Sequence, residues 1–99
     1  MISNQILQNT IDGVKGITKI DLSVVDADGN VLAETAGDSE DYCATVKIFA
    51  DSPADSQAIL GYQFFKVYDE SQLEYIVVAK GEAEDVYMIG KIVVFQIQN

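Results

Sequence analysis

The C-terminal segment "VYMIGKIVVFQIQN", residues 86–99, limits most strongly what this chain can fold into. Wound as an α-helix, it carries apolar side chains around most of its circumference, and only a narrow sector near Lys91 and Gln98 is polar. One face of a sheet cannot cover such a helix, so we expect a second covering surface, supplied by another copy of the chain. A central helix wrapped by its own domain is the alternative. The side chains predicted at the dimer interface are Tyr87, Met88, Val94 and Phe95.

The length of 99 residues and the hydrophobic content of 48% predict a single folded domain over residues 1–99. Its most apolar stretch, residues 86–97, is too short and too interrupted for a membrane span. The start, residues 1–5, lacks the basic and apolar regions of an export signal, and the single cysteine, Cys43, cannot form an internal disulfide. We therefore expect a cytoplasmic protein with no membrane contact.

The charge balance narrows the classes of function. Sixteen acidic residues stand against six lysines, without arginine or histidine, and the formal net charge is −10. Such a domain repels a phosphate backbone, so we expect no direct contact with nucleic acid. Histidine is the usual general base near neutral pH and a common metal ligand. With no catalytic constellation and no ligand cluster in the sequence, we expect no enzyme, no catalytic or metal-binding residues and no cofactor.

An amphipathic helix is predicted over residues 3–14, followed by a strand. The side chains that share its apolar side are Ile6, Leu7, Thr10, Ile11 and Val14. Gly13 and Gly16 are predicted to end this helix. The next segment, "ITKIDLSVV" (residues 17–25), is rich in β-branched residues and alternates in polarity, which is typical of a strand.

The stretch "VVDADGNVLAET", residues 24–35, has the acidic spacing of either a calcium loop or a turn. A calcium loop of the EF-hand type needs glycine at its sixth position and glutamate at its twelfth. Counted from Asp26, the glycine comes fourth and the twelfth residue is Gly37, so the register fails. Asp28-Gly29 between apolar segments instead predicts a β-hairpin, because glycine accepts the positive φ of a tight turn.

Four further elements complete an α+β fold. A second helix is predicted from Ser39 as its cap to Pro53, with Tyr42, Val46, Phe49 and Ala50 on one side, although "ATVKIF" also has strand propensity. The segments "AILGYQFFKVYD" (58–69) and "LEYIVVAK" (73–80) are predicted strands that pair as a hairpin around Glu70. Gly81 then breaks the strand, and the acidic residues Glu82, Glu84 and Asp85 favour a helix start.

The order of helix, strand, Asp-x-Asp-Gly turn, strand, helix, strand, strand and helix resembles that of the small PAS-like sensory modules. Four segments also resemble the sugar diacid recognition domain at the front of carbohydrate diacid regulators. They are the leading helix with "IDG", the stretch "VVDADGNVLAET", the run from Gly61 to Gly81, and "GEAEDVYMIGKIV". The fold that this resemblance implies is α+β and PAS-like, with a central antiparallel sheet flanked by N-terminal, middle and C-terminal helices.

The resemblance also implies a function. It identifies the chain as the sensory and dimerisation domain of a bacterial transcriptional regulator of carbohydrate or organic-acid metabolism, with the DNA-binding region beyond Asn99. It places a ligand site for a carbohydrate acid or another metabolite between sheet and helices, lined by Lys47, Tyr62, Phe64 and Lys66. The interpretation without a ligand is that the two aromatic residues fill the core and the two lysines are solvated. The alternative function is a ligand-free dimerisation or interaction module, roadblock-like or a degenerate PAS-like domain.

Overall fold

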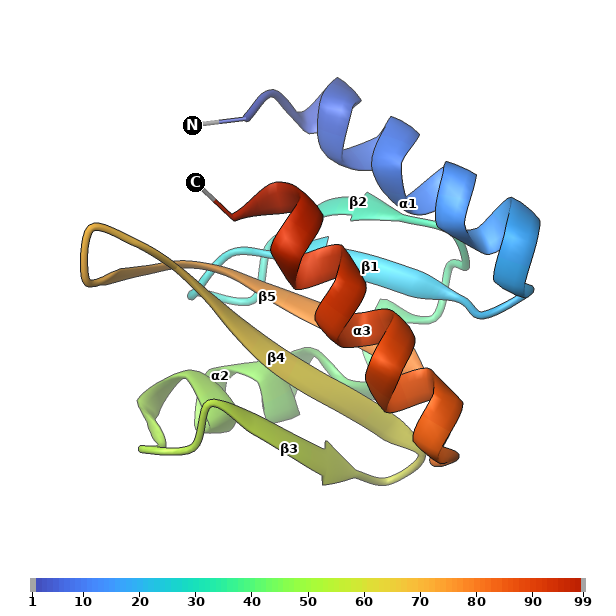
Figure 1. Ribbon diagram of the computed structural model, residues 1–99. Coiled ribbons are helices and arrows are strands. Elements are labelled where there is room, and N and C mark those ends of the chain that lie inside the picture. Colours follow the sequence, from blue (N-terminus) through green and yellow to red (C-terminus); the bar gives the residue numbers. More distant parts are fainter. Residues whose placement is uncertain (1, 99) are drawn as a thin grey trace.

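The computed structural model describes residues 2–98, so Met1 and Asn99, the two ends of the predicted domain, lie outside the described residues. It contains one five-stranded antiparallel sheet and three α-helices (Figure 1). The elements in chain order are α1 (Asn4–Thr18), β1 (Leu22–Val25), β2 (Val31–Glu34), a 3-10 turn (Ser39–Asp41), α2 (Cys43–Asp51), β3 (Ser56–Ile59), β4 (Tyr62–Asp69), β5 (Gln72–Lys80) and α3 (Glu84–Ile97). The strand order is β2-β1-β5-β4-β3. The predicted α+β fold, a central antiparallel sheet flanked by N-terminal, middle and C-terminal helices, is confirmed.

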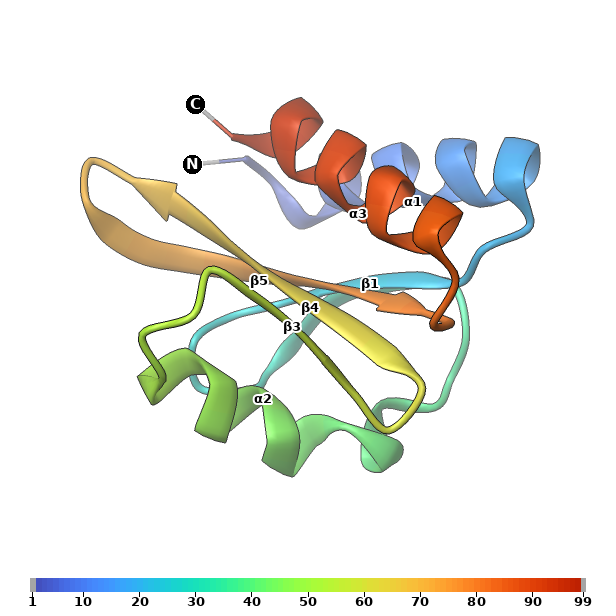
Figure 2. The ribbon, with the colours of Figure 1, turned by 60° about the horizontal axis from the view of Figure 1, so that its bottom comes forward.

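The sheet separates two hydrophobic cores. Helices α1 and α3 lie side by side on one face, and α2 lies alone on the other face (Figure 2). Leu7 and Ile11 of α1 and Val93 of α3 pack on the first face. Val46 and Phe49 of α2 pack on the second. Because consecutive strand residues point to opposite faces, the central strands β4 and β5 are apolar on both sides and serve both cores.

Helix α1 is longer than predicted. It passes through Gly13 and Gly16 and ends only after Thr18, where Lys19 adopts a left-handed φ of 64°. A helical glycine costs about 1 kcal/mol relative to alanine. That cost is offset by the contacts of the apolar side of α1 with the sheet, which local sequence does not reveal. The following strand is shorter as a result, since β1 begins at Leu22 instead of residue 17.

The predicted strand over residues 58–69 is wrong in one respect, because it is two strands. Leu60 and Gly61 both have positive φ, 52° and 86°, and form a two-residue turn between β3 and β4. This is the turn geometry that fits the right-handed twist of hairpin strands. A second hairpin of the same kind joins β4 to β5, with Glu70 and Ser71 at φ of 50° and 72°, as predicted around Glu70.

The hairpin prediction for residues 24–35 is confirmed. The N–H of Asp26 donates to the carbonyl of Asn30 at 2.9 Å, and Gly29 has a φ of 90°. The carboxylate of Asp26 accepts hydrogen bonds from the backbone N–H groups of Asp28 and Asn30, each at 2.9 Å. These bonds within the loop are those of an Asx-type turn.

Helix α2 agrees with the prediction on its buried side but not at its start. Tyr42, Val46 and Phe49 are buried, and the helix ends at Asp51, before Pro53. Residues Ser39–Asp41 form a 3-10 turn, and the N-cap position of that turn is Asp38. The predicted Ser39 cap is therefore wrong.

Candidate functional site

The ligand pocket was predicted between the sheet and its helices, and the space between the sheet and α2 is filled by aromatic side chains. Tyr62 and Phe64 are both buried and face α2. The ring centroids of Tyr62 and Tyr42 are 5.0 Å apart, and those of Phe64 and Phe49 are 5.8 Å apart. These are ordinary separations for packed aromatic pairs. The aromatic residues of the predicted pocket therefore form the core on this side.

The two predicted ligand-binding lysines lie apart from each other and from any common pocket. Lys66 is buried; its ammonium donates to the carbonyl of Ser52, the residue that follows α2, and lies 5.0 Å from the Phe49 ring centroid. A cation at a helix C-terminus is favourable there, so Lys66 stabilises α2. Lys47 is exposed and lies over Gly29 of the first hairpin. The sequence does not reveal that Lys47 of α2 and Lys66 of β4 lie in different surroundings, so both lysines were assigned to one site.

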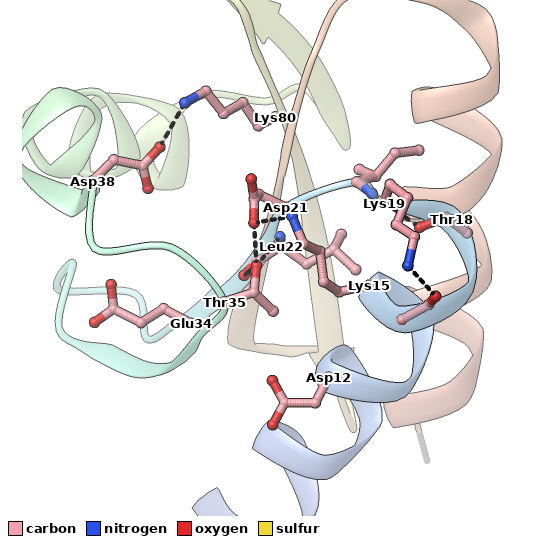
Figure 3. A network of polar contacts seen from close by, with 12 residues as sticks. Asp12, Lys15, Thr18, Lys19, Asp21, Leu22, Glu34, Thr35, Asp38 and Lys80 are labelled. Carbon is pink, nitrogen blue, oxygen red and sulfur yellow. Dashed lines mark hydrogen bonds and ion pairs between the residues drawn. The ribbon is translucent and has the colours of Figure 1, made fainter.

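A polar network joins α1, β1 and the loop after β2 (Figure 3). The Lys15 ammonium donates to the Asp21 carboxylate at 2.7 Å, and the Thr35 hydroxyl donates to the same oxygen at 2.9 Å. The hydrogen bond from Lys15 is the largest cause of a lowered pKa for Asp21. This network fixes the C-terminal half of α1 to the sheet.

A neighbouring group of polar side chains surrounds a cavity of about 10 Å³. The Tyr62 hydroxyl donates to Asp38 at 2.8 Å, and the Lys80 ammonium lies 3.4 Å from the same carboxylate oxygen. The Tyr42 hydroxyl donates to the Ser23 hydroxyl at 2.7 Å. A cavity of this size has room for about one water molecule. It is too small for a metabolite.

The hydroxyls of Tyr62 and Tyr42 act as hydrogen-bond donors. Burial, together with the hydrogen bond to Asp38, raises the pKa of Tyr62 well above its ordinary value. Burial likewise raises the pKa of Tyr42. A phenol with a raised pKa stays protonated at neutral pH and cannot act as a base. Within residues 2–98, no group of acidic or cysteine side chains is arranged to hold a metal ion.

An open groove of about 260 Å³ lies on the other face of the sheet, between β3, β4 and the start of α3. Gln63, Phe65 and Tyr87 line it, together with Ser56, Gln57 and Ala58. The Gln63 amide donates to the carbonyls of Gly81 and Ala83 at 3.1 and 3.2 Å, which holds the start of α3 in place. The lining contains aromatic and amide groups but no charged side chain.

The outer face of α3 remains apolar and exposed. Tyr87, Met88, Ile92 and Phe95 expose 41%, 58%, 50% and 78% of their surface. Three of the four predicted interface residues, Tyr87, Met88 and Phe95, are therefore on this face. The fourth is a correction: Val94 is buried against the sheet with Val86, Val93 and Ile97, because it lies on the inner side of the helix.

Helix α1, which lies beside α3, also exposes apolar side chains. Its residues Ile6 and Ile17 expose 55% and 85% of their surface. Ile6 was predicted on the buried side of α1, but only Leu7 and Ile11 are fully covered there. We name the six exposed side chains of α1 and α3 the outer helical face: Ile6, Ile17, Tyr87, Met88, Ile92 and Phe95.

Gln8 has a role that sequence reasoning missed. Its amide nitrogen donates to the carbonyl of Glu34 at 2.8 Å, and its amide oxygen accepts from the N–H of Glu34 at 3.1 Å. The side chain thus bonds to the edge strand β2 as a neighbouring strand would. The two residues are 26 positions apart in the sequence, and no local pattern indicates the contact.

Comparison with known proteins gives no match, whether with protein-family models, with characterised proteins or with solved structures. Among residues 2–98, no helix is both long enough and apolar enough to span a membrane.

Proposed function

We propose that this chain is the small-molecule-sensing and dimerisation domain of a bacterial transcriptional regulator of carbohydrate or organic-acid metabolism, acting in the cytoplasm. Two copies associate through the outer helical face. The observation that carries this proposal is the exposure of four large apolar side chains on α3, the helix that the resemblance to sugar diacid recognition domains makes the output element. Exposed apolar surface of this kind marks a site of protein contact.

The charge distribution supports a second copy as the partner. Each copy has a net charge of −10, so two copies repel each other unless they meet where charges are few. All six residues of the outer helical face are uncharged, and the acidic residues of α3, Glu84 and Asp85, are confined to its first turn. The other charged residue of α3, the exposed Lys91, is basic and lies among these apolar residues at helical spacing. The proposed contact between two outer helical faces, called the helical seam below, therefore combines burial of apolar surface with little repulsion between acidic residues.

The sensing step is proposed at the groove of Gln63, Phe65 and Tyr87. This groove is the open space next to α3 into which a small molecule fits, and its volume of about 260 Å³ is close to the lower end of the range for ligand pockets. Its uncharged lining suits a neutral polar metabolite better than a diacid, which normally recruits arginine or helix N-terminal amides. A ligand touching Tyr87 would act directly on the helix that carries the seam.

A ligand-free dimerisation module is the second candidate. The observation that favours it is the filled interior, where aromatic side chains leave a cavity of only about 10 Å³ on the α2 side. Both candidates share the outer helical face, and they differ in whether a metabolite changes the domain.

Sedimentation velocity tests the seam. We expect Phe95→Ser, which removes the most exposed large apolar side chain of α3, at 78%, to halve the assembly mass of the wild type. The matched control is Ile48→Ser on α2, which is 71% exposed but lies on the opposite face of the sheet. Equal dissociation by both variants, or by neither, contradicts the proposed seam.

A thermal-shift screen against sugar acids, hydroxy acids, neutral sugars and nucleotides separates the two candidates. A ligand at a hundred times its Kd stabilises the folded form by about 2.7 kcal/mol, which raises the melting temperature by several degrees. A hit whose shift is lost in Tyr87→Ala supports sensing at the groove. Absence of any shift favours the ligand-free module.

A further inference from the structure

The edge strand β3 exposes unpaired backbone groups. The N–H of Lys66 on β4 donates to the carbonyl of Asp55 at 2.9 Å, and the strands pair in register from Ser56 with Phe65 to Ile59 with Tyr62. Hydrogen-bonded positions alternate along an antiparallel strand. Gln57 and Ile59 therefore bond to β4, whereas the N–H and carbonyl groups of Ser56 and Ala58 point away from the sheet.

We propose that β3 pairs antiparallel with β3 of a second copy, joining two five-stranded sheets into one. Only one register pairs both outward-facing residues of each strand. Ser56 then exchanges two hydrogen bonds with Ala58 of the second copy, and Ala58 does so with Ser56. Gln57 lies on the two-fold axis opposite its own equivalent, with the two Cα atoms about 4.5 Å apart in a pair without hydrogen bonds.

The charges along β3 fit this partner. No charged residue lies between Asp55 and Lys66, the longest such interval at any strand of this acidic chain. In the proposed register the two copies of Asp55 are four residues apart along the seam, about 14 Å at the rise of a strand. This exceeds the Debye length of about 8 Å at physiological salt, so their repulsion is largely screened.

Leu60 is a second, independent observation at the same edge. It exposes 84% of its surface and has a φ of 52°, in the left-handed region. That conformation costs a branched apolar residue about 1–2 kcal/mol, and asparagine or glycine is usual there. Glu70 in the other two-residue turn has a similar φ of 50°, so what distinguishes Leu60 is the large apolar side chain that it exposes. In the proposed register Leu60 lies opposite Ala54 of the second copy, next to Pro53, so its neighbours across the seam are apolar.

The β3 seam is separate from the seam of the proposed function. The outer helical face lies above one face of the sheet, whereas β3 is the lateral edge (Figure 2). The two contacts use different surfaces, and where their two-fold axes are perpendicular and intersect, together they close a tetramer with the symmetry common among homo-oligomers.

Cysteine cross-linking tests the register. In a Cys43→Ser background, Gln57→Cys places two sulfurs within disulfide reach, and mild oxidation should give about tenfold more linked dimer than Glu70→Cys, a control at the exposed turn between β4 and β5. The measurement is non-reducing electrophoresis at a protein concentration where the assembly forms. Equal cross-linking of the two variants overturns the proposal.

Assembly mass provides the second test. Ala58→Pro removes one outward N–H without breaking a bond to β4, and Ala58→Lys adds a charge at the edge should the proline variant fail to fold. We expect either variant to halve the sedimentation mass of the wild type, and to give a monomer when combined with Phe95→Ser. An unchanged mass in a folded Ala58 variant overturns the β3 seam, while an unchanged mass in Phe95→Ser overturns the helical seam instead.

Discussion

At one edge of the sheet the backbone of β2 is bonded to the Gln8 side chain of α1, whereas at the other edge the backbone of β3 faces outward. The β2 edge also carries a register shift against β1, opposite Val24 and Val25, which interrupts regular pairing. Such interruptions and covering groups prevent a strand from pairing with another chain. In the part of the chain that the structure describes, β3 has neither device. The contrast indicates which edge is available for assembly.

The two helices on this face of the sheet, α1 near the β2 edge and α3 near the β3 edge, also differ in how they contact the sheet. Helix α1 is fixed near the β2 edge by polar side chains, Gln8 at Glu34 and Lys15 at Asp21. Helix α3 instead lies directly on the Phe65 ring, at Gly90. Both helices pack apolar side chains on the sheet. The helix at the closed edge adds side-chain hydrogen bonds to β2 and to Asp21, whereas the closest packing on the sheet is that of α3 at Gly90.

The largest expected effect breaks the packing beside the open edge. A Cβ added at Gly90 would lie 2.2 Å from Cε2 of Phe65, a ring that is itself fully buried. We expect Gly90→Ala to lower the free energy of unfolding by about 2–3 kcal/mol, as overpacking of a core does. Urea unfolding measures this change.

The control for that variant is Gly13→Ala on α1, where no described atom beyond the neighbouring residues and the backbone of its own helix lies within 4 Å of the added Cβ. Because alanine is the better helix former, this variant should gain about 0.5–1 kcal/mol. Similar losses in the two helices would show that α1 and α3 are packed alike, against the contrast drawn above.

Opening the closed edge is the second prediction. Gln8→Ala removes two part-buried hydrogen bonds to Glu34, and we expect a loss of about 1–2 kcal/mol in urea unfolding. The uncovered strand should also promote self-association at high protein concentration, measured by light scattering. Gln5→Ala is the control, since Gln5 bonds only to Asn9 on the exposed side of α1. No difference between the two glutamine variants would mean that Gln8 does not protect β2.

Relieving strain at the open edge is the third prediction. Leu60→Asn should raise the free energy of unfolding by about 0.5–1 kcal/mol, because asparagine tolerates the left-handed conformation. It should also weaken assembly, since the apolar side chain is lost. Glu70→Asn is a matched control at the other hairpin, where φ is 50°. It should give a similar gain in stability and leave the assembly mass unchanged.

The smallest effect concerns the ion pair that fixes α1. The pKa of Asp21 is lowered, so the pair stabilises the fold above the ordinary value of 3.8 and loses this contribution as pH falls through the lowered pKa. For a partly exposed pair, Lys15→Met should cost about 0.5 kcal/mol at pH 7. The difference from the wild type should shrink as the pH falls below 3.8 and vanish once Asp21 is protonated in both proteins. Urea unfolding over a series of acidic pH values measures this, and a difference that does not shrink in acid would assign the effect to packing.

Local chemistry accounts for much of the fold that could be predicted. The hairpin at Asp28-Gly29, the turn at Glu70 and the buried side of α2 follow from turn residues and helical spacing, which involve neighbours in sequence. The last segment of the chain could be predicted as a helix from its acidic first turn and its length. The division between β3 and β4 was missed although Gly61 indicated a turn, since Leu60 is unusual at the position before it.

Less of the candidate site could be predicted. Tyr62 and Phe64 were predicted to lie between the sheet and its helices, but whether they line a pocket or fill a core depends on Tyr42 and Phe49, which approach only in the folded chain. Val94 illustrates the same limit, because a helix that is apolar nearly all round does not reveal which side the sheet will cover.

By itself the sequence determined the presence of three helices, the hairpins at Asp28-Gly29 and at Glu70, and an excess of apolar side chains on the last helix, because periodicity and turn chemistry are local properties. Only the tertiary structure decided which apolar residues remain exposed, that Gln8 covers β2, and that β3 is left open. Those outcomes depend on contacts between residues distant in sequence, whose geometry is set by the packing of α1 and α3 on one sheet.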